Sequence, residues 1–276
     1  MRPGCVSTVG SFCLESGPDL VYHRRMRYGV ADYGINAWSG GMFDYEDRLI
    51  RLKEIGYEGT ERITAFSEAD AVQKAARVRR LGMGFATVRG PSDELSIQWA
   101  AAFGCRYVWV NAKPTDYDLD TFCRQASIYA ESCARWGLRA ALHNHMGTCV
   151  ESQEEVERFL EQCPECTLVL DTAHLAAVGG DPVAIIRGYP ERIEVMHMKD
   201  WFETNPKAER WFERGRFCEL NAGNIGMDHT AIMKALRETG FDGWMFVEQD
   251  THLQDPFADL AVSRRILDDI ASAVGS

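Results

Sequence analysis

The sequence has no long apolar run and comparatively few basic residues. No stretch approaches the roughly 18–20 consecutive apolar residues that a membrane-spanning helix needs. The formal net charge is −11, from 41 acidic and 30 basic side chains. Because nucleic-acid binding needs a basic surface that displaces counterions, this balance argues against a polyanionic partner. We therefore expect neither a membrane nor a nucleic acid as partner.

The sequence also lacks the paired cysteine motifs of a disulfide framework or a zinc ribbon. Its nine cysteines are scattered, and the one CxxC, Cys163-Pro-Glu-Cys166, has no second pair. This motif falls where a helix is expected to turn into a strand, so we interpret it as structural rather than redox-active or zinc-binding. The opening residues do not resemble a secretion signal, and we expect reduced thiols in the cytoplasm.

Residues 1–25 show neither a continuous apolar core nor a clear periodicity. We expect them to form a disordered extension and residues 26–276 to form one catalytic domain. Within that domain a glycine repeatedly follows an amphipathic segment and precedes a β-rich run, as in Ile55-Gly56-Tyr57 and Trp136-Gly137-Leu138. Such a glycine is typical of the residue that ends a helix.

This repeat predicts eight strand–helix units. The expected strands are 28–37, 57–63, 83–89, 105–112, 138–145, 166–172, 193–199 and 243–249. The expected helices lie near 44–55, 68–81, 92–103, 119–136, 153–162, 182–189, 229–239 and 256–272, and several begin with a capping side chain. Eight such units predict a single (β/α)₈ TIM barrel. A doubly wound sheet is disfavoured because no GxGxxG opens the first helix. The long connection 200–228 is expected to form a lid or rim of the active site.

Potential metal ligands and acid–base groups stand at the ends of the last four strands. In barrels of this kind the chemistry collects at the carboxyl ends of the strands. Residues two apart on a strand share a face, which groups these side chains in pairs. The pairs are His143 with His145, His197 with Lys199, and Glu248 with Asp250, while Asp171 is followed by His174 after the chain begins to turn.

Each of these residues, taken alone, also has a structural interpretation. A single strand-end histidine is often a core or rim residue, Asp171 could cap the next turn, and Glu248 could pair with a lysine. Together, four consecutive strands each supply one ligand at the same level, which predicts a divalent metal held by His143, Asp171, His197 and Glu248. Two imidazoles with two carboxylates suit Mn²⁺, Co²⁺, Fe²⁺ or Zn²⁺ better than Ca²⁺ or Mg²⁺, and Mn²⁺ is our first expectation.

Two weaker signals concern substrate binding. Trp38, with Asn36, could line a sugar pocket at the end of the first strand, and core packing is the equal alternative for the tryptophan. Glu61, near the end of the second strand, could bind a substrate hydroxyl or pair with an arginine.

Several motifs resemble those of the xylose-isomerase-like barrel superfamily of sugar isomerases and epimerases. They are HNHMGT, LDTAHLAAVGGDP, HMKD, FCELNAGNIGMD and GWMFVEQD. Within that superfamily they are most similar to the inosose (2-keto-myo-inositol) dehydratases. The resemblance implies that Asp171, His197 and Glu248 are ligands and that His174 contacts the substrate. His143 stands where the superfamily usually has a glutamate.

That exchange favours elimination over proton exchange, because epimerases of this type use paired glutamates. Elimination needs one base, one acid and a metal that stabilises the enolate. We therefore expect a metal-dependent lyase (dehydratase) acting on a keto-polyol or keto-sugar. Glu248 or His145 would be the base, and His174 or Lys199 would assist the departing hydroxyl.

Four other outcomes stay open. The same barrel could serve a keto-sugar epimerase or isomerase, or an enzyme that cleaves 3-keto (C-)glycosides. An endonuclease for damaged DNA would need a multi-zinc cluster and a basic groove. A barrel that only binds sugar would need no catalysis. The partner in the expected reaction is a small molecule, and whether the chain forms a homo-oligomer is left open.

Overall fold

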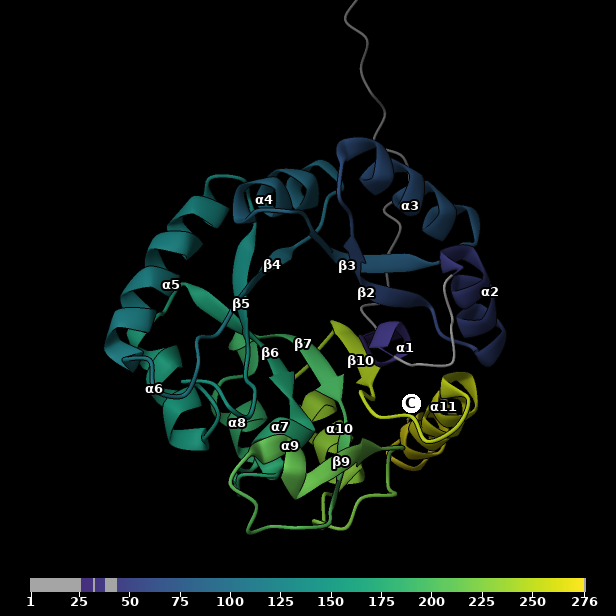
Figure 1. Ribbon diagram of the computed structural model, residues 1–276, viewed down its shortest axis with the longest axis vertical. Helices are drawn as coiled ribbons and strands as arrows, with labels where there is room; N and C mark the ends of the chain where they lie inside the picture. The colour runs from purple at the N-terminus through teal and green to yellow at the C-terminus, as the bar shows by residue number, and fades with distance from the viewer. Residues whose placement is uncertain (1–25, 32, 38–43, 276) are drawn as a thin grey trace, which may run out of the picture.

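The chain forms a closed ring of parallel strands surrounded by helices (Figure 1). The computed structural model describes residues 26–31, 33–37 and 44–275. The barrel strands are β1 (Arg27–Ala31), β2 (Gly59–Thr64), β3 (Gly84–Arg89), β4 (Tyr107–Val110), β5 (Arg139–His143), β6 (Cys166–Asp171), β7 (Ile193–Met198) and β10 (Trp244–Glu248). Their spatial order is β3-β2-β1-β10-β7-β6-β5-β4, and every pair is parallel. The predicted single (β/α)₈ barrel is confirmed.

The seam between β3 and β4 is the place where the ring closes without a strand ladder among the described residues. A side chain bridges it instead, because the Thr87 hydroxyl on β3 donates to the Tyr107 carbonyl on β4 at 2.7 Å. The two strands therefore lie side by side, and the barrel is complete.

The longer helices cover the outside of the ring, close to the ranges that the sequence predicts, whereas the short α1, α7 and η1 are not predicted as helices (Figure 1). They are α1 (Tyr33–Ala37), α2 (Tyr45–Ile55), α3 (Glu68–Arg80), α4 (Asp93–Ala102), α5 (Leu119–Ala134), α6 (Gln153–Gln162), α7 (Thr172–Ala176), α8 (Pro182–Gly188), a 3₁₀ turn η1 (Pro190–Arg192), α10 (His229–Glu238) and α11 (Pro256–Ala273). Side-chain caps set their starts, including the capping box of Ser152 and Glu155. None of the helices within the described part of the chain is long and apolar enough to cross a membrane.

The first strand is shorter than predicted. The expectation of a strand over 28–37 is wrong beyond Ala31, because Tyr33–Ala37 form helix α1. Packing explains the turn: Ile35 is buried, and a Cβ on Gly34 would collide with the Gln249 carbonyl. This segment therefore follows the loop after β10 instead of extending the sheet. Trp38 and residues 1–25 lie outside the described residues.

The long connection 200–228 contains an antiparallel hairpin and a short helix. Strand β8 (Asp200–Glu203) pairs with β9 (Gly215–Cys218), and α9 (Trp211–Arg214) lies between them. The hairpin begins directly after β7, so it stands at the carboxyl end of the barrel strands. The expected rim is therefore present as a folded unit with its own core, which includes Trp201 and Phe217.

Two large aromatic side chains on β10 fill the inside of the barrel, because the next two strands in the sheet, β1 and β2, carry glycine beside them. Trp244 and Phe246 on β10 stack with ring centroids 5.1 Å apart. A Cβ on Gly59 would lie 2.6 Å from the Trp244 ring, and one on Gly29 would meet the Phe246 ring at a similar distance. Small residues on β1 and β2 thus compensate for large ones on β10, as close packing demands.

We predict that Gly59→Ala lowers the free energy of unfolding by about 1–3 kcal/mol, because the added methyl would collide with the Gly84 carbonyl oxygen on β3 and would lie 2.6 Å from the Trp244 ring. Chemical denaturation with a circular-dichroism readout measures the change. Gly188→Ala is the matched control, since nothing lies within 4 Å of its added Cβ. Equal stability of the two variants would contradict the packing argument.

Candidate metal centre

The four predicted ligands meet at the carboxyl end of the barrel. His143, Asp171 and Glu248 are the last residues of β5, β6 and β10, and His197 is the penultimate residue of β7. These strands are neighbours in the sheet, and Asp171 is in register with His197. One potential ligand atom from each residue lies within 4.8 Å of the other three, and all four residues are buried.

The donor atoms converge on one point. His143 Nε2 lies 3.3 Å from Asp171 Oδ2, and His197 Nδ1 lies 2.7 Å from Glu248 Oε2. His197 Nδ1 is also 3.7 Å from Asp171 Oδ2. Asp171 uses its other oxygen, Oδ1, to cap α7 by accepting from the backbone N–H of His174. Capping and ligation, the two interpretations of Asp171, are thus compatible.

Buried polar atoms without hydrogen-bond partners support a cation at this point. His197 Nδ1 and Glu248 Oε2 are buried, and neither has a partner of hydrogen-bond geometry among the described residues, although they are close together. Buried polar groups are normally satisfied, so such atoms need an explanation. Two imidazole nitrogens and two carboxylates form a donor set that suits a divalent transition metal. The residues present therefore fit a divalent metal.

Glu61 lies behind His197 rather than in the open cavity. Its Oε1 is 3.2 Å from His197 Nε2, and it accepts hydrogen bonds from Trp109 Nε1 at 2.9 Å and the Tyr107 hydroxyl at 3.2 Å. Burial alone would raise the pKa of Glu61, but the adjacent His197 imidazole holds it below its ordinary value. His197 Nε2 has no partner of hydrogen-bond geometry among the described residues, so Glu61 holds the outer side of the ring by its charge and its proximity, which keeps Nδ1 towards the other three residues.

Asn144 positions Asp171 from the other side. Its Oδ1 accepts from the Asp171 backbone N–H at 2.8 Å, and its Nδ2 donates to the Asp171 carbonyl at 3.1 Å. The side chain thereby extends the β5–β6 pairing past the end of β5. The sequence gives no signal for this role, because it depends on how two strand ends lie side by side.

The His145 and His174 rings lie against each other beside the four predicted ligands, with centroids 3.6 Å apart and planes tilted by 35°. Strand β5 ends at His143, so His145 lies in the following loop rather than on the strand as predicted. Its Nδ1 lies 2.6 Å from the Met146 carbonyl and must donate to it, which leaves Nε2 unprotonated. Burial, with His143 and Lys199 nearby, lowers the pKa of His145 to about 4.

His174 lies behind His145 and is fully buried. Its Nδ1 faces the Met146 backbone N–H at 3.3 Å, and its Nε2 is 3.3 Å from Lys199 Nζ. Burial holds the pKa of His174 well below its ordinary value. The structure thus places it against Lys199 and His145, and the expected contact with substrate stays a prediction.

Lys199 is a fully buried cation among carboxylates. Its Nζ donates to Asp250 Oδ2 at 2.6 Å and lies 3.3 Å from Glu248 Oε2 and 3.6 Å from Asp171 Oδ2. Burial would lower the pKa of Lys199, but Asp250 and Glu248 hold it above its ordinary value, so the ammonium stays charged. The ammonium therefore offsets part of the negative charge of these three carboxylates.

Asp250 shares the Lys199 ammonium and faces the open cavity. Burial raises its pKa to about 6, because the opposing effect of Lys199 is partly offset by Glu248. Its Oδ1 is buried without a partner among the described residues. Sequence reasoning paired Asp250 with Glu248 on one face but gave it no role; the raised pKa depends on burial, which the sequence does not show.

An open cavity of about 370 Å³ lies above this cluster. Its described lining combines site residues with aromatic rings from several elements: Tyr33, Arg62, Trp109, His143, His145, Trp201, Trp211, Phe212, Gly215, Arg216, Phe217, Glu248, Asp250 and Thr251. Asn36 is not part of this lining; it is exposed and accepts a hydrogen bond from Arg48. The hairpin of β8 and β9 thus supplies one wall of the cavity.

A model of the xylose isomerase-like TIM barrel family matches residues 49–269. The chain belongs to this family. The resemblance drawn from the sequence motifs is therefore confirmed.

Among curated xylose isomerase-like relatives, the rhizopine catabolism protein MocC of Rhizobium meliloti is 33% identical over 168 residues, which cover 56% of this chain and 51% of that protein. The inosose dehydratase of Lacticaseibacillus casei is 31% identical over 144 residues, covering 48% of each. The chain matches about half the length of these relatives.

Solved structures of other proteins share the fold. The probable 3-DHS dehydratase AsbF of Bacillus anthracis superposes with a TM-score of 0.69 at 15% identity, covering 88% of this chain and 99% of that one. An L-ribulose 3-epimerase gives a TM-score of 0.69 at 18% identity, covering 90% and 95%.

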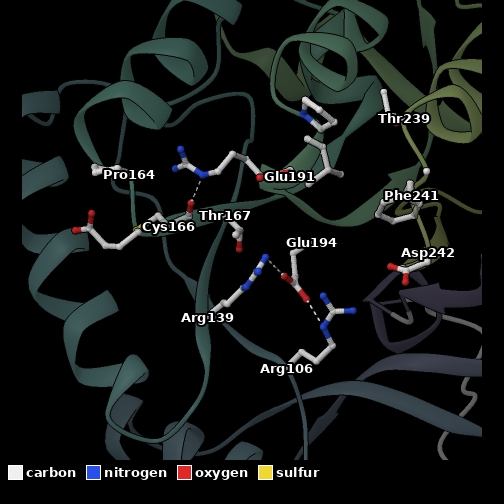
Figure 2. A pocket seen from close by; sticks show the side chains of 16 residues that line it. Arg106, Arg139, Pro164, Cys166, Thr167, Glu191, Glu194, Thr239, Phe241 and Asp242 are labelled. Carbon is white, nitrogen blue, oxygen red and sulfur yellow. Dashed lines mark hydrogen bonds and ion pairs between the residues drawn. The ribbon is translucent and has the colours of Figure 1, made fainter. Parts of the chain in front are cut away.

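A second cavity, of about 590 Å³, lies at the opposite end of this xylose isomerase-like barrel. Figure 2 shows Glu194 between Arg139 and Arg106, and its carboxylate pairs with them at 3.2 and 3.1 Å. Arg192 is likewise satisfied, because its guanidinium donates to three backbone carbonyls. Glu194, its two arginines and Arg192 therefore find their partners within the protein, as expected for the stabilising face of such barrels.

We predict that Glu61→Gln weakens metal binding by about 10- to 100-fold, because the ring of His197 loses its orienting carboxylate. Titration of the metal-free protein with Mn²⁺, followed by calorimetry, measures the affinity. Glu165→Gln is the matched control, since Glu165 is exposed at the other end of the barrel. Unchanged affinity in Glu61→Gln would contradict the positioning role.

Metal binding should strengthen as the pH rises. Burial would lower the pKa of His197, but Glu61 and Glu248 hold it well above its ordinary value in the metal-free protein. A protonated imidazole cannot be a ligand, so the cation must displace this proton. We expect the Mn²⁺ affinity to increase by up to about tenfold per pH unit from pH 6 to pH 8. A pH-independent affinity without proton release would refute this account.

Proposed function

We propose that the chain is a metal-dependent lyase that removes water from a keto-polyol or keto-sugar such as 2-keto-myo-inositol. One observation carries the proposal: the cavity floor separates carboxylates from imidazoles. Glu248 and Asp250 stand on the β10 side, whereas His143 and His145 stand on the β5 side. The described lining of this cavity has no carboxylate on the β5 side, so a proton exchange between two opposed carboxylates is disfavoured.

A divalent metal held by His143, Asp171, His197 and Glu248 would supply Lewis-acid chemistry, polarising a ketone and lowering the pKa of the adjacent C–H. The protein residues around the substrate divide the proton transfers between them. The base must be unprotonated at neutral pH, and the acid must hold a proton that it can release.

His145 is the base that the geometry favours. Its Nδ1 proton is held by the Met146 carbonyl, so the lone pair of Nε2 is available to take the α-proton. Its lowered pKa keeps it neutral. Glu248, the other candidate from the sequence, is one of the four residues that would hold the metal, and Lys199 and His197 overcome the effect of burial and hold its pKa well below its ordinary value. The His174 ring lies 3.6 Å from that of His145 and supports it.

Asp250 with Lys199 is the acid side of the proposal. A carboxyl with a pKa of about 6 can donate a proton to the departing hydroxyl, which leaves as water. The neighbouring ammonium then stabilises the carboxylate that remains. In this arrangement Lys199 assists the leaving group through Asp250.

The relatives support the same chemistry. Several curated relatives are named inosose dehydratase, and AsbF shares the fold and is named a probable dehydratase. The described cysteines all carry free thiols, which supports the expected reducing, cytoplasmic setting.

The test is turnover of 2-keto-myo-inositol by the metal-free protein before and after addition of Mn²⁺ or Co²⁺. We expect a metal-dependent dicarbonyl product, seen by absorbance. His145→Gln should keep the metal content of the wild type and lower kcat by about 10²- to 10⁴-fold. Its neighbour His143→Gln should lose metal, so the pair separates base from ligand.

Performing the reaction in D₂O distinguishes the alternatives. If deuterium is incorporated into a ketopolyol without loss of water, the reaction is epimerisation and the dehydratase proposal is wrong. Wild-type turnover by His145→Gln would remove that histidine from the mechanism.

A further inference from the structure

The cavity wall opposite the catalytic floor is aromatic. The hairpin and α9 contribute Trp201, Trp211, Phe212 and Phe217, and Tyr33 stands at the rim from α1. The floor, in contrast, presents imidazoles and carboxylates. A keto-polyol bears hydroxyl groups around its whole ring, so the floor matches it, whereas among the described lining residues the hairpin side adds to its aromatic rings only the guanidinium of Arg216 as a charged group.

The wall is built as a rigid unit. Trp201 and Phe217 meet edge to face with ring centroids 4.9 Å apart, and Trp211 contacts Phe212 at 5.7 Å. Trp211 lies directly on Gly147, where an added Cβ would be 2.7 Å from the indole. Its ring also meets His145 at 5.2 Å, so the wall begins where the proposed base stands.

Two rings at the mouth of the cavity remain exposed. The exposed fraction of Phe212 is 53% and that of Tyr33 is 54%, although both line the cavity. Large apolar side chains clustered at an exposed site mark a binding surface. A lone six-membered polyol on the floor leaves these outer rings in water, whereas a ligand with an apolar extension covers them.

We propose that this wall is a subsite for an aromatic group joined to the keto-sugar ring, so that the substrate class is a keto-sugar carrying an aromatic substituent. The proposal rests on the proposed function for the orientation of the ring: the carbonyl lies on the metal side and the substituent points towards Trp211 and Phe212. Aromatic pairs prefer offset-stacked or edge-to-face contacts, which rings arranged at several angles can provide. The cavity volume of about 370 Å³ is within the range of pockets for ligands larger than a simple monosaccharide.

The test compares phenyl β-D-glucopyranoside with methyl β-D-glucopyranoside, neither of which has a reactive ketone. Calorimetry on the Mn²⁺-loaded protein gives both dissociation constants. We expect the phenyl glycoside to bind at least about tenfold more tightly, because its ring is buried against the wall.

Two variants locate the preference. Phe212→Ala truncates an exposed ring, and Trp211→Ala removes the ring that contacts His145; both should reduce the preference for the phenyl glycoside to about twofold or less. Trp136→Ala is the matched control, because Trp136 is also half-exposed but precedes β5 at the opposite end of the barrel. It should retain the full preference.

Equal affinity for the two glycosides, no binding of the phenyl glycoside at millimolar concentration, or a preference that survives both variants would each overturn the subsite. Turnover of 2-keto-myo-inositol, measured on the same preparations, keeps the two proposals separate. Turnover without the aromatic preference refutes the subsite alone. The aromatic preference without turnover of any ketopolyol refutes the dehydratase and leaves the subsite standing.

Discussion

The site depends on a fully buried ammonium. Lys199 Nζ lies within 3.6 Å of carboxylate oxygens from Asp171, Glu248 and Asp250, in a part of the barrel that excludes water. Without this charge the carboxylates would repel one another, and burial would favour their protonation. The ammonium therefore keeps Asp171 and Glu248 ionised for a cation while Asp250, which is less strongly stabilised as an anion, retains a pKa near neutrality. The single ammonium of Lys199 thus sets apart the two carboxylates that would bind the metal from Asp250, the carboxyl that would act as the acid.

The same lysine connects the chemistry to the cavity wall. Its ammonium lies 3.9 Å from the centre of the Phe217 ring, and the hairpin begins at the next residue, Asp200. Asp200 in turn accepts from the backbone N–H groups of Trp201 and Gly223, which ties both ends of the insertion together. Contacts with Lys199 and Asp200 therefore hold the hairpin in place, and they fix the position of its aromatic rings relative to the four residues that would bind the metal.

The sequence was sufficient for the barrel and for the four-residue cluster that could hold a metal, because both follow from repetition. Each of the last four barrel strands places an acid or an imidazole at its end, and parallel strands bring their carboxyl ends together. Local patterns failed where tertiary packing decides. The segment after Ala31 alternates like a strand, yet Gly34 fits against the Gln249 backbone only as part of a helical turn. The role of Asn144 and the acidity of Asp250 depend on neighbours distant in sequence. The aromatic wall lies in a connection without periodicity, where no pattern indicates which rings face the cavity.

The seam between β3 and β4 lies on the same line of contacts as the metal ligands. At the seam the Tyr107 carbonyl accepts a hydrogen bond from the Thr87 hydroxyl. The Tyr107 hydroxyl in turn donates a hydrogen bond to Glu61, whose carboxylate lies beside His197. A chain of side-chain contacts therefore runs from the seam, where no strand ladder closes the barrel among the described residues, to the His197 imidazole that would hold the cation. A cation that bound at this point would fix the His197 imidazole and, through Glu61 and Tyr107, would restrain the residues at the seam. A metal held here would therefore stabilise the closure of the barrel between β3 and β4 in addition to supplying Lewis-acid chemistry.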